Sequence, residues 1–266
     1  MIAAFLLAAV AARPLPFDAR VEATRALERA RYRFVIGATK PFDELYARKV
    51  FVDRVRRMLD EERILQRRFG VVITPEMLDD EYKRIEVMTK DQDQWDAMKA
   101  VLGNDRSFIE EVVCRPLLAD RLLRVKFGFD QEIHAGPHQQ ARAARALFLA
   151  GEKVPAARRL VLDRAVRGGA TTEEMLEQSK KEATGPRETA PRAGKEESLP
   201  RPVDSEMARI LERELLKAGD VTTILEDRER FSVFRLIELR PDRWIVQAVT
   251  FPKIEFDAWF DRERKT

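Results

Sequence analysis

The stretch FSVFRLIELRPDRWIVQAVTF, residues 231–251, decides the fold of this chain of 266 residues. It holds two runs rich in Val, Ile and Phe, 231–239 and 244–251, on either side of the turn sequence Arg240-Pro241-Asp242-Arg243. Such a pattern is typical of two antiparallel strands joined by a short connection. A shorter run of the same character, 221–226, predicts a third strand. We therefore expect a small antiparallel sheet near the C-terminus.

The sequence before this stretch predicts helices. From residue 18 to 150, apolar residues recur near the helical period and alternate with Arg, Asp and Glu. Residues 42–69 form one such segment, and Thr74-Pro75-Glu76 is typical of a helix start. Residues 107–127 form another, which we expect Pro116 to kink. Further helices are predicted over 137–149, 155–167, 203–218 and 256–264.

These patterns predict an α+β fold that is predominantly α. The expected parts are a signal peptide (1–12), a multi-helix module (13–150), a unit with the small sheet (151–252) and a C-terminal helix (253–266). Residues 179–202 carry four prolines and many charges, which predicts a flexible loop inside the sheet unit.

The charge balance and the motifs exclude several classes of function. Lys and Arg number 49 and Asp and Glu 46, and the two signs are interleaved, which argues against a nucleic-acid partner. No Walker loop is present, so we expect no nucleotide and no ATP-driven machinery. No metal or cofactor motif stands out, since Gly136-Pro137 between His134 and His138 favours a surface loop. The single cysteine, Cys114, lies among valines and is expected to be a small buried residue.

The N-terminus points to export. Ile2–Ala12 reads IAAFLLAAVAA, which is too short to span a bilayer as a helix, since that needs roughly 20 residues. It has the length of the apolar part of a signal peptide, although no Lys or Arg precedes it; the alternative is an apolar helix packed on the core. The expectation is a periplasmic protein whose contact with membranes is at most transient.

Five short motifs carry a family resemblance. Ile73-Thr74-Pro75-Glu76 and Gly103-Asn104-Asp105 precede helices of the N-terminal part. Residues 166–170 (VRGGA), 216–222 (LKAGDVT) and 230–236 (RFSVFRL) follow in the C-terminal part. In this order they resemble the SurA/PrsA-like periplasmic foldases, which join a helical chaperone module to a parvulin-type peptidyl-prolyl isomerase domain. The resemblance covers residues 26–133 and the sheet-forming part, with 230–236 placed at the last strand of the parvulin domain. It also implies that the C-terminal helix returns to pack on the helical module.

The chain departs from that family where its catalytic groups belong. The strand histidine of the family falls on Ser232, and its Asp or Cys falls near Lys180 and Lys181. Its first histidine falls nearest Leu147 or Phe148. The resemblance thus implies a degenerate isomerase unit with no catalytic residues.

The function that follows is ATP-independent holding of unfolded or newly exported envelope proteins. One set of side chains within 22 residues offers an adaptable apolar surface for such clients: Met77, Tyr82, Met88, Trp95 and Met98. The alternative for these residues is ordinary packing between helices. Two alternatives for the function also stay open, an active isomerase with a rearranged site and an assembly factor dedicated to a single envelope partner.

Overall fold

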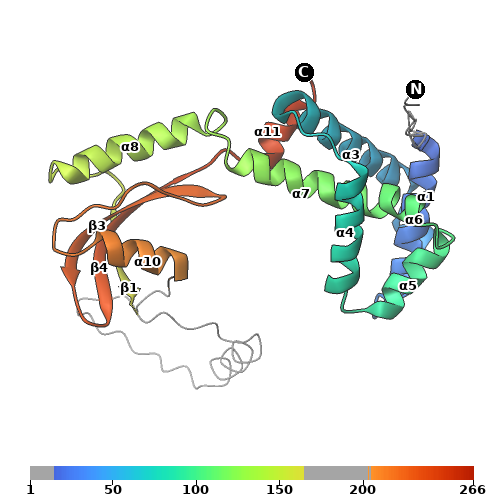
Figure 1. Cartoon of the computed structure of the whole chain (residues 1–266), viewed down its shortest axis with the longest axis horizontal. Helices are drawn as coiled ribbons and strands as arrows, with labels where there is room; N and C mark the ends of the chain where they lie inside the picture. The colour runs from blue at the N-terminus through green and yellow to red at the C-terminus, as the bar shows by residue number, and fades with distance from the viewer. Residues whose placement is uncertain (1–14, 165–202, 204) are drawn as a thin grey trace, which may run out of the picture. The chain divides into compact units, whose positions relative to one another are not determined.

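The structure is a computed structural model that describes residues 15–164, 203 and 205–266 (Figure 1). The predicted signal peptide, the predicted loop 179–202 and the positions Lys180 and Lys181 lie outside the described residues. The described part is mostly helical with one small antiparallel sheet, so the predicted α+β class, predominantly α, is confirmed. The chain divides into two compact units, of which one comprises residues up to 127 together with 256–266, and the other residues 128–255.

The first unit is a set of helices. Their bounds are α1 Phe17–Tyr32, α2 Phe42–Leu45, α3 Arg48–Phe69, α4 Pro75–Met88, α5 Gln92–Val101, α6 Arg106–Ile109, the π-helical turn η1 Glu110–Cys114, α7 Arg115–Gly128 and α11 Phe256–Glu263. Local signals set several of these ends. The Thr74 hydroxyl accepts a hydrogen bond from the Met77 N–H at 3.3 Å, and Asp105 accepts one from the Phe108 N–H at 3.1 Å.

Two predicted helices of this unit are interrupted. The segment 42–69 breaks at residues 46–47, which separate α2 from α3. The segment 107–127 changes to π-helical bonding over η1, where the Arg115 N–H donates to the Glu110 carbonyl. Pro116 follows at once and has no N–H to donate, so the irregular turn stands where the sequence predicted a kink.

The C-terminal helix belongs to the first unit. The Trp259 ring centre lies 4.8 Å from that of Phe127 and 6.4 Å from that of Phe69. Arg57 of α3 adds an ion pair to Asp257 at 2.8 Å. These contacts confirm the expectation that the C-terminal helix returns to pack on the helical module.

The second unit is a sheet with a helix on each face. Its elements are α8 Ala135–Leu149, β1 Arg158–Asp163, α10 Ser205–Glu214, β2 Leu225–Glu226, β3 Arg230–Leu239 and β4 Arg243–Pro252. The antiparallel sheet has the order β1-β4-β3-β2. Phe231 and Val233 of β3 pack with α8, whereas Phe234 and Leu236 pack with α10 (Figure 1).

Two expectations for this unit change. The helix predicted over 155–167 is wrong, because residues 158–163 form β1 and pair with β4 from Arg158↔Ala248 to Asp163↔Arg243. The boundary between the helical module and the sheet unit, expected at residue 150, falls instead between residues 127 and 128. The reason is that α8 packs on the sheet and so belongs to the second unit.

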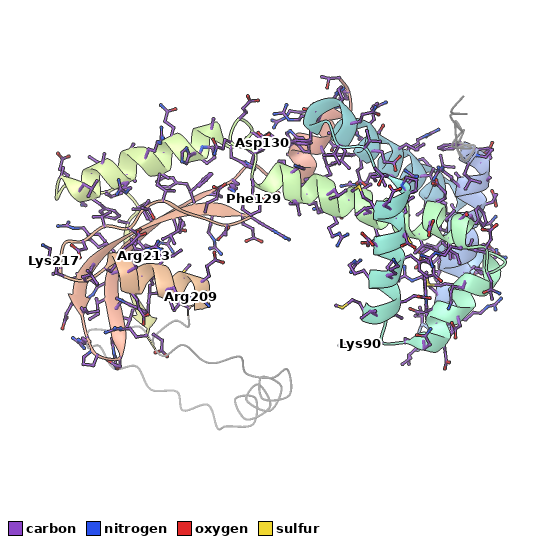
Figure 2. The ribbon with its side chains drawn as sticks, in the orientation of Figure 1. Lys90, Phe129, Asp130, Arg209, Arg213 and Lys217 are labelled. Carbon is purple, nitrogen blue, oxygen red and sulfur yellow. The ribbon has the colours of Figure 1, made fainter. Side chains whose placement is uncertain are left out.

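A buried lysine holds together the two ends of the sheet unit. The Lys253 ammonium donates to the Gly128 carbonyl at 2.5 Å, to the Asp227 carbonyl at 2.7 Å and to Glu226 at 2.7 Å. The same ammonium lies 5.0 Å from the ring centre of Phe129, which Figure 2 labels. Its charge is thus satisfied although the side chain is buried.

Candidate functional site

The helical unit contains an apolar cavity of about 240 Å³. Its lining comes from α1, α3, α5 and the stretch from η1 into α7. The apolar part of the lining consists of Leu27, Val55, Met58, Met98, Val112, Val113, Pro116 and Leu117. We call this set the apolar groove. Leu117 stands at its open side with half of its surface exposed (50%).

Local sequence explains why these side chains share one surface. On α1, Arg20, Thr24, Leu27, Glu28 and Arg31 follow the i, i+4, i+7, i+8 and i+11 spacing of one helix face. A turn with π-type bonding offsets the side chains that follow it relative to a regular α-helix. Val112 and Val113 lie within the irregular turn and Leu117 follows it, so all three residues reach the groove from one short stretch of chain.

Charged side chains rim the groove, and the first group centres on Glu111. The Arg20 guanidinium donates to a Glu111 carboxylate oxygen at 2.7 Å and to the Glu111 backbone carbonyl at 3.1 Å. Arg115 donates to the same carboxylate at 2.6 Å. Burial alone would raise the pKa of Glu111, but the hydrogen bonds from Arg115 and Arg20 outweigh it and lower that pKa. The carboxylate therefore stays ionised at neutral pH.

In the second group of the rim, two Arg side chains surround a single Glu. The Glu28 carboxylate lies 2.6 Å from the Arg54 guanidinium and 3.2 Å from that of Arg31. One negative charge serves two positive charges, so this side of the rim keeps a surplus of positive charge. The arrangement offers an apolar floor for aliphatic or aromatic side chains and a polar edge for backbone or acidic groups.

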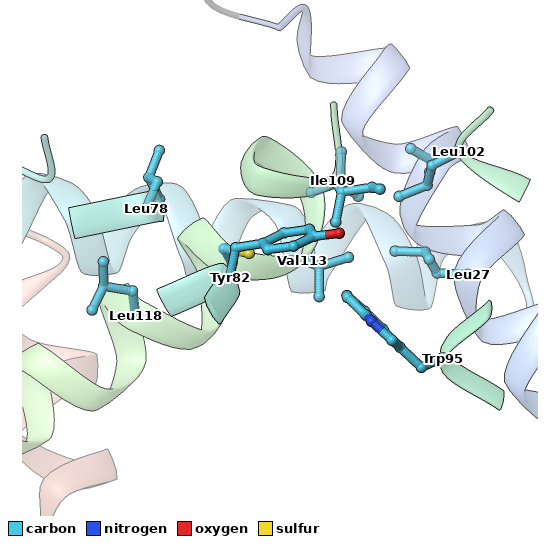
Figure 3. Packing of buried hydrophobic residues seen from close by; sticks show 11 residues of the cluster. Leu27, Leu78, Tyr82, Trp95, Leu102, Ile109, Val113 and Leu118 are labelled. Atoms are coloured by element: carbon cyan, nitrogen blue, oxygen red, sulfur yellow. The ribbon is translucent and has the colours of Figure 1, made fainter. Parts of the chain in front are cut away.

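The predicted client-binding residues fall mostly in the core of the helical unit. Tyr82 and Trp95 are buried, with ring centres 6.0 Å apart (Figure 3). Met77 and Met98 are partly buried against the same cluster. Met88 is the exception, since 67% of its surface is exposed at the end of α4. The packing alternative therefore describes Met77, Tyr82, Trp95 and Met98, and only Met98 also lines the groove.

Residues of the groove other than Met98 were missed by the sequence reasoning. They lie on helices separated by up to 90 positions in the chain, as Leu27 and Leu117 are. The signal available in the sequence was Pro116 inside an otherwise helical segment, because it marked the place where helical bonding would change.

Ser232 lies in the sheet and not beside the histidines. It is buried on β3, opposite Thr250 of β4 and Leu225 of β2. Side chains alternate along a strand, so Ser232 faces the α10 side with Phe234. Both histidines belong to the α8 side: His134 precedes α8 and His138 packs on Phe231 at 5.2 Å.

One expectation about the histidines is wrong. His134 and His138 do not lie in a surface loop, because Gly136 and Pro137 occupy the first turn of α8, where proline is tolerated. His134 is buried, and its Nδ1 accepts a hydrogen bond from the Ile254 N–H at 3.3 Å. Leu147 and Phe148 lie in α8, within the helix predicted over 137–149, and the first strand of the sheet is β1.

Other chemistry has few candidates among the described residues. Cys114 is buried, as predicted. In the described ranges, no three His, Cys, Asp or Glu side chains gather in a group that could hold a metal ion. None of the helices that the structure describes combines the length and apolarity needed to cross a membrane.

The fold and the groove define the class of the molecule as an α-rich α+β protein with an apolar groove in its helical unit. Comparisons with protein-family models, with curated proteins and with solved structures found no match. The resemblance to SurA/PrsA-like foldases therefore stays a prediction.

Proposed function

We propose that this protein is an ATP-independent chaperone of the SurA/PrsA-like kind, which holds unfolded or newly exported envelope proteins in the periplasm. The observation that carries the proposal is the apolar groove of the helical unit, with its charged rim. Unfolded chains differ from folded ones in exposing large apolar side chains, and a groove with an apolar floor binds such side chains without regard to sequence.

The size of the groove favours weak and reversible binding. At about 30 Å³ per water molecule, its 240 Å³ correspond to roughly eight waters, which is room for a few side chains of a client and not for a folded segment. Burial of apolar surface of the client contributes about 25 cal/mol per Å² to the free energy of binding. The cost of ordering the client offsets part of this contribution, so the net affinity is modest. Exchange of clients then needs no nucleotide.

The proposal treats the sheet unit as inactive in prolyl isomerisation. Uncatalysed isomerisation has a barrier near 20 kcal/mol, and an enzyme lowers it with positioned polar groups. Ser232 stands where the resemblance places a histidine, and His134 and His138 lie on the other side of the sheet. We expect no rate enhancement in a protease-coupled prolyl peptide assay; a clear enhancement would favour the active-isomerase alternative.

Light scattering of an aggregation-prone client tests the holding function. The client is diluted from denaturant with and without the chain, in the absence of nucleotide. We use a form that lacks Met1–Ala12, so that the apolar N-terminal stretch does not bind the client itself. Suppression of scattering near an equimolar ratio supports the proposal, and unchanged scattering contradicts it.

A pair of matched variants assigns the activity to the groove. Leu117→Asp places a charge at the open side of the groove, whereas Leu149→Asp makes the same change at a comparably exposed site on α8 (50% and 59% exposed). We expect Leu117→Asp to raise the concentration needed for half suppression several-fold and Leu149→Asp to leave it unchanged. Equal effects of the two variants would remove the groove from the proposal.

A further inference from the structure

The loop between α1 and α2 presents three consecutive apolar residues to solvent. Phe34 and Val35 are exposed, and Ile36 is exposed over its whole surface (100%). We call these three residues the apolar tip. A folded protein rarely leaves such a run uncovered unless it serves an interaction.

The tip is held in place by the structure beneath it. The Tyr32 hydroxyl donates to the Lys40 carbonyl at 2.6 Å, which closes the base of the loop. Gly37 has a φ of +79°, a conformation that glycine adopts readily, and it turns the chain just after Ile36. Below the loop, Phe42 packs between Tyr32 and Phe51, at 5.7 Å and 6.0 Å between ring centres. The apolar tip thus stands on a packed aromatic base.

Two cations flank the tip. Residues 25–50 contain seven Lys and Arg and three Asp and Glu. Arg48 of this stretch is paired with Asp18 and Glu22, and Lys49 with Asp53, so the positive charge left near the tip includes that of Arg33 and Lys40. Arg33 and Lys40 flank the tip and are exposed, and the part of the chain that the structure describes gives neither side chain an ion-pair partner. Asp43, the nearest acid of α2, is shared by Arg25 and Arg29 at 2.7 and 2.5 Å.

We propose that the apolar tip and its flanking cations bind the surface of a lipid bilayer that contains anionic lipids. Phe34, Val35 and Ile36 would enter the boundary between headgroups and acyl chains, while Arg33 and Lys40 contact lipid phosphates. The small size of the tip favours lipid over a protein partner, because a stable protein interface buries about 800 Å² on each side and needs a complementary surface. This inference is independent of the proposed holding function.

A fluorescent label at Ile36 tests the insertion directly. The single natural cysteine, Cys114, is buried, so in Ile36→Cys the introduced thiol is the accessible one. A polarity-sensitive fluorophore is attached to this thiol in two forms of the protein, the full chain and a form that lacks Met1–Ala12. The shorter form is included because the apolar residues 2–12 of the full chain would bind vesicles themselves. Val87→Cys is the control, because Val87 of α4 is also apolar and exposed (83%).

The two labelled variants are mixed with vesicles of phosphatidylglycerol and phosphatidylcholine, or of phosphatidylcholine alone. We expect the emission from position 36 to shift to shorter wavelength with the anionic vesicles, to shift less as salt is added, and to stay constant with the neutral ones. The label at position 87 should not respond. A label at position 36 that remains in water overturns the proposal, as does an equal response at position 87.

Co-sedimentation with the same vesicles gives an independent measurement. We expect Val35→Ser combined with Ile36→Ser, and separately Arg33→Gln combined with Lys40→Gln, to weaken binding to anionic vesicles at least tenfold. The exposed control Val87→Ser combined with Met88→Ser should bind like the unchanged chain. Undiminished binding by the tip variants contradicts the proposal. A label at position 36 that responds to a client protein but not to vesicles also contradicts it and identifies a protein-binding loop.

Discussion

The Lys253 ammonium and the Gly128 carbonyl, 125 positions apart in the chain, form a hydrogen bond of 2.5 Å inside the sheet unit. Gly128 is the first residue of that unit, and Lys253 lies two residues before its last. The bond therefore joins the two places where the chain enters and leaves the unit. Glu226 and the Asp227 carbonyl complete the environment of the ammonium, and the Phe231 ring lies 4.7 Å from it.

Removal of this ammonium is expected to destabilise the sheet unit. Lys253→Met keeps an unbranched side chain of similar length but leaves the Gly128 and Asp227 carbonyls without their donor. We expect a loss of about 2–3 kcal/mol in the free energy of unfolding, measured by urea denaturation. Glu226→Gln should lower the free energy of unfolding by less, because the Glu226 side chain is 36% exposed and water can replace its interaction with the ammonium. A Lys253→Met variant as stable as the original chain would contradict the argument.

Glu61 on α3 makes the stability of the helical unit depend on pH. Burial raises the pKa of Glu61 from 4.5 to about 7, and the hydrogen bond from Arg57 only partly offsets that effect. Asp120 raises the pKa of Glu61 further, whereas Arg124 lowers it. The folded state therefore retains a proton that the unfolded chain releases. The free energy of unfolding should fall as the pH rises from about 4.5 to about 7 and then stay level.

The variant Glu61→Gln tests this dependence, because its side chain cannot ionise. We expect the free energy of unfolding of this variant to change less with pH between these values than that of the original chain. At pH 8 the variant should be more stable than the original chain by about 1–3 kcal/mol. Urea denaturation at a series of pH values measures both effects. Glu44→Gln, at an exposed site on α2, serves as the control and should leave the profile unchanged. Destabilisation by Glu61→Gln at pH 8 would show that the Glu61 carboxylate is needed in its charged form.

Cys114 is expected to be inert in the folded protein. Burial raises the pKa of its thiol to about 12, and the nearby carboxylates of Glu110 and Glu81 add to the effect. Because the thiolate is the reactive form, a disulfide reagent at pH 8 should react with less than a tenth of the chains in native buffer and with all of them in urea. Reaction of one equivalent within minutes under native conditions would contradict the burial of this residue.

Local signals in the sequence were sufficient for much of the helical part. Thr74-Pro75-Glu76 starts a helix because its hydroxyl, its proline ring and its acidic side chain all act within one turn. The same reasoning located the hairpin of β3 and β4, since its turn lies between two adjacent apolar runs. Such features depend on residues a few positions apart, which a sequence displays directly.

The errors arose where distant residues decide the structure. Residues 158–163 form a strand because they pair with β4, whose partner residues lie 80 to 90 positions later in the chain. The sequence RRLVLD by itself also suits a helix. The groove was missed for a similar reason, since Leu27, Val55 and Leu117 meet only after several helices have packed. Tyr82 and Trp95 were assigned to a client surface because apolar spacing is the same for a binding face and for a core face.

The place of α11 in the helical unit has a consequence for the order in which the protein is completed during synthesis. Every residue of the sheet unit, 128–255, is made before Trp259 and Phe260. A growing chain can thus finish its sheet while the partners of α11, Phe69 and Phe127 among them, still lack their cover. A chain cut after residue 255 would therefore keep the described strands of the sheet unit, while its helical unit would lack the packing of α11 on Phe69 and Phe127.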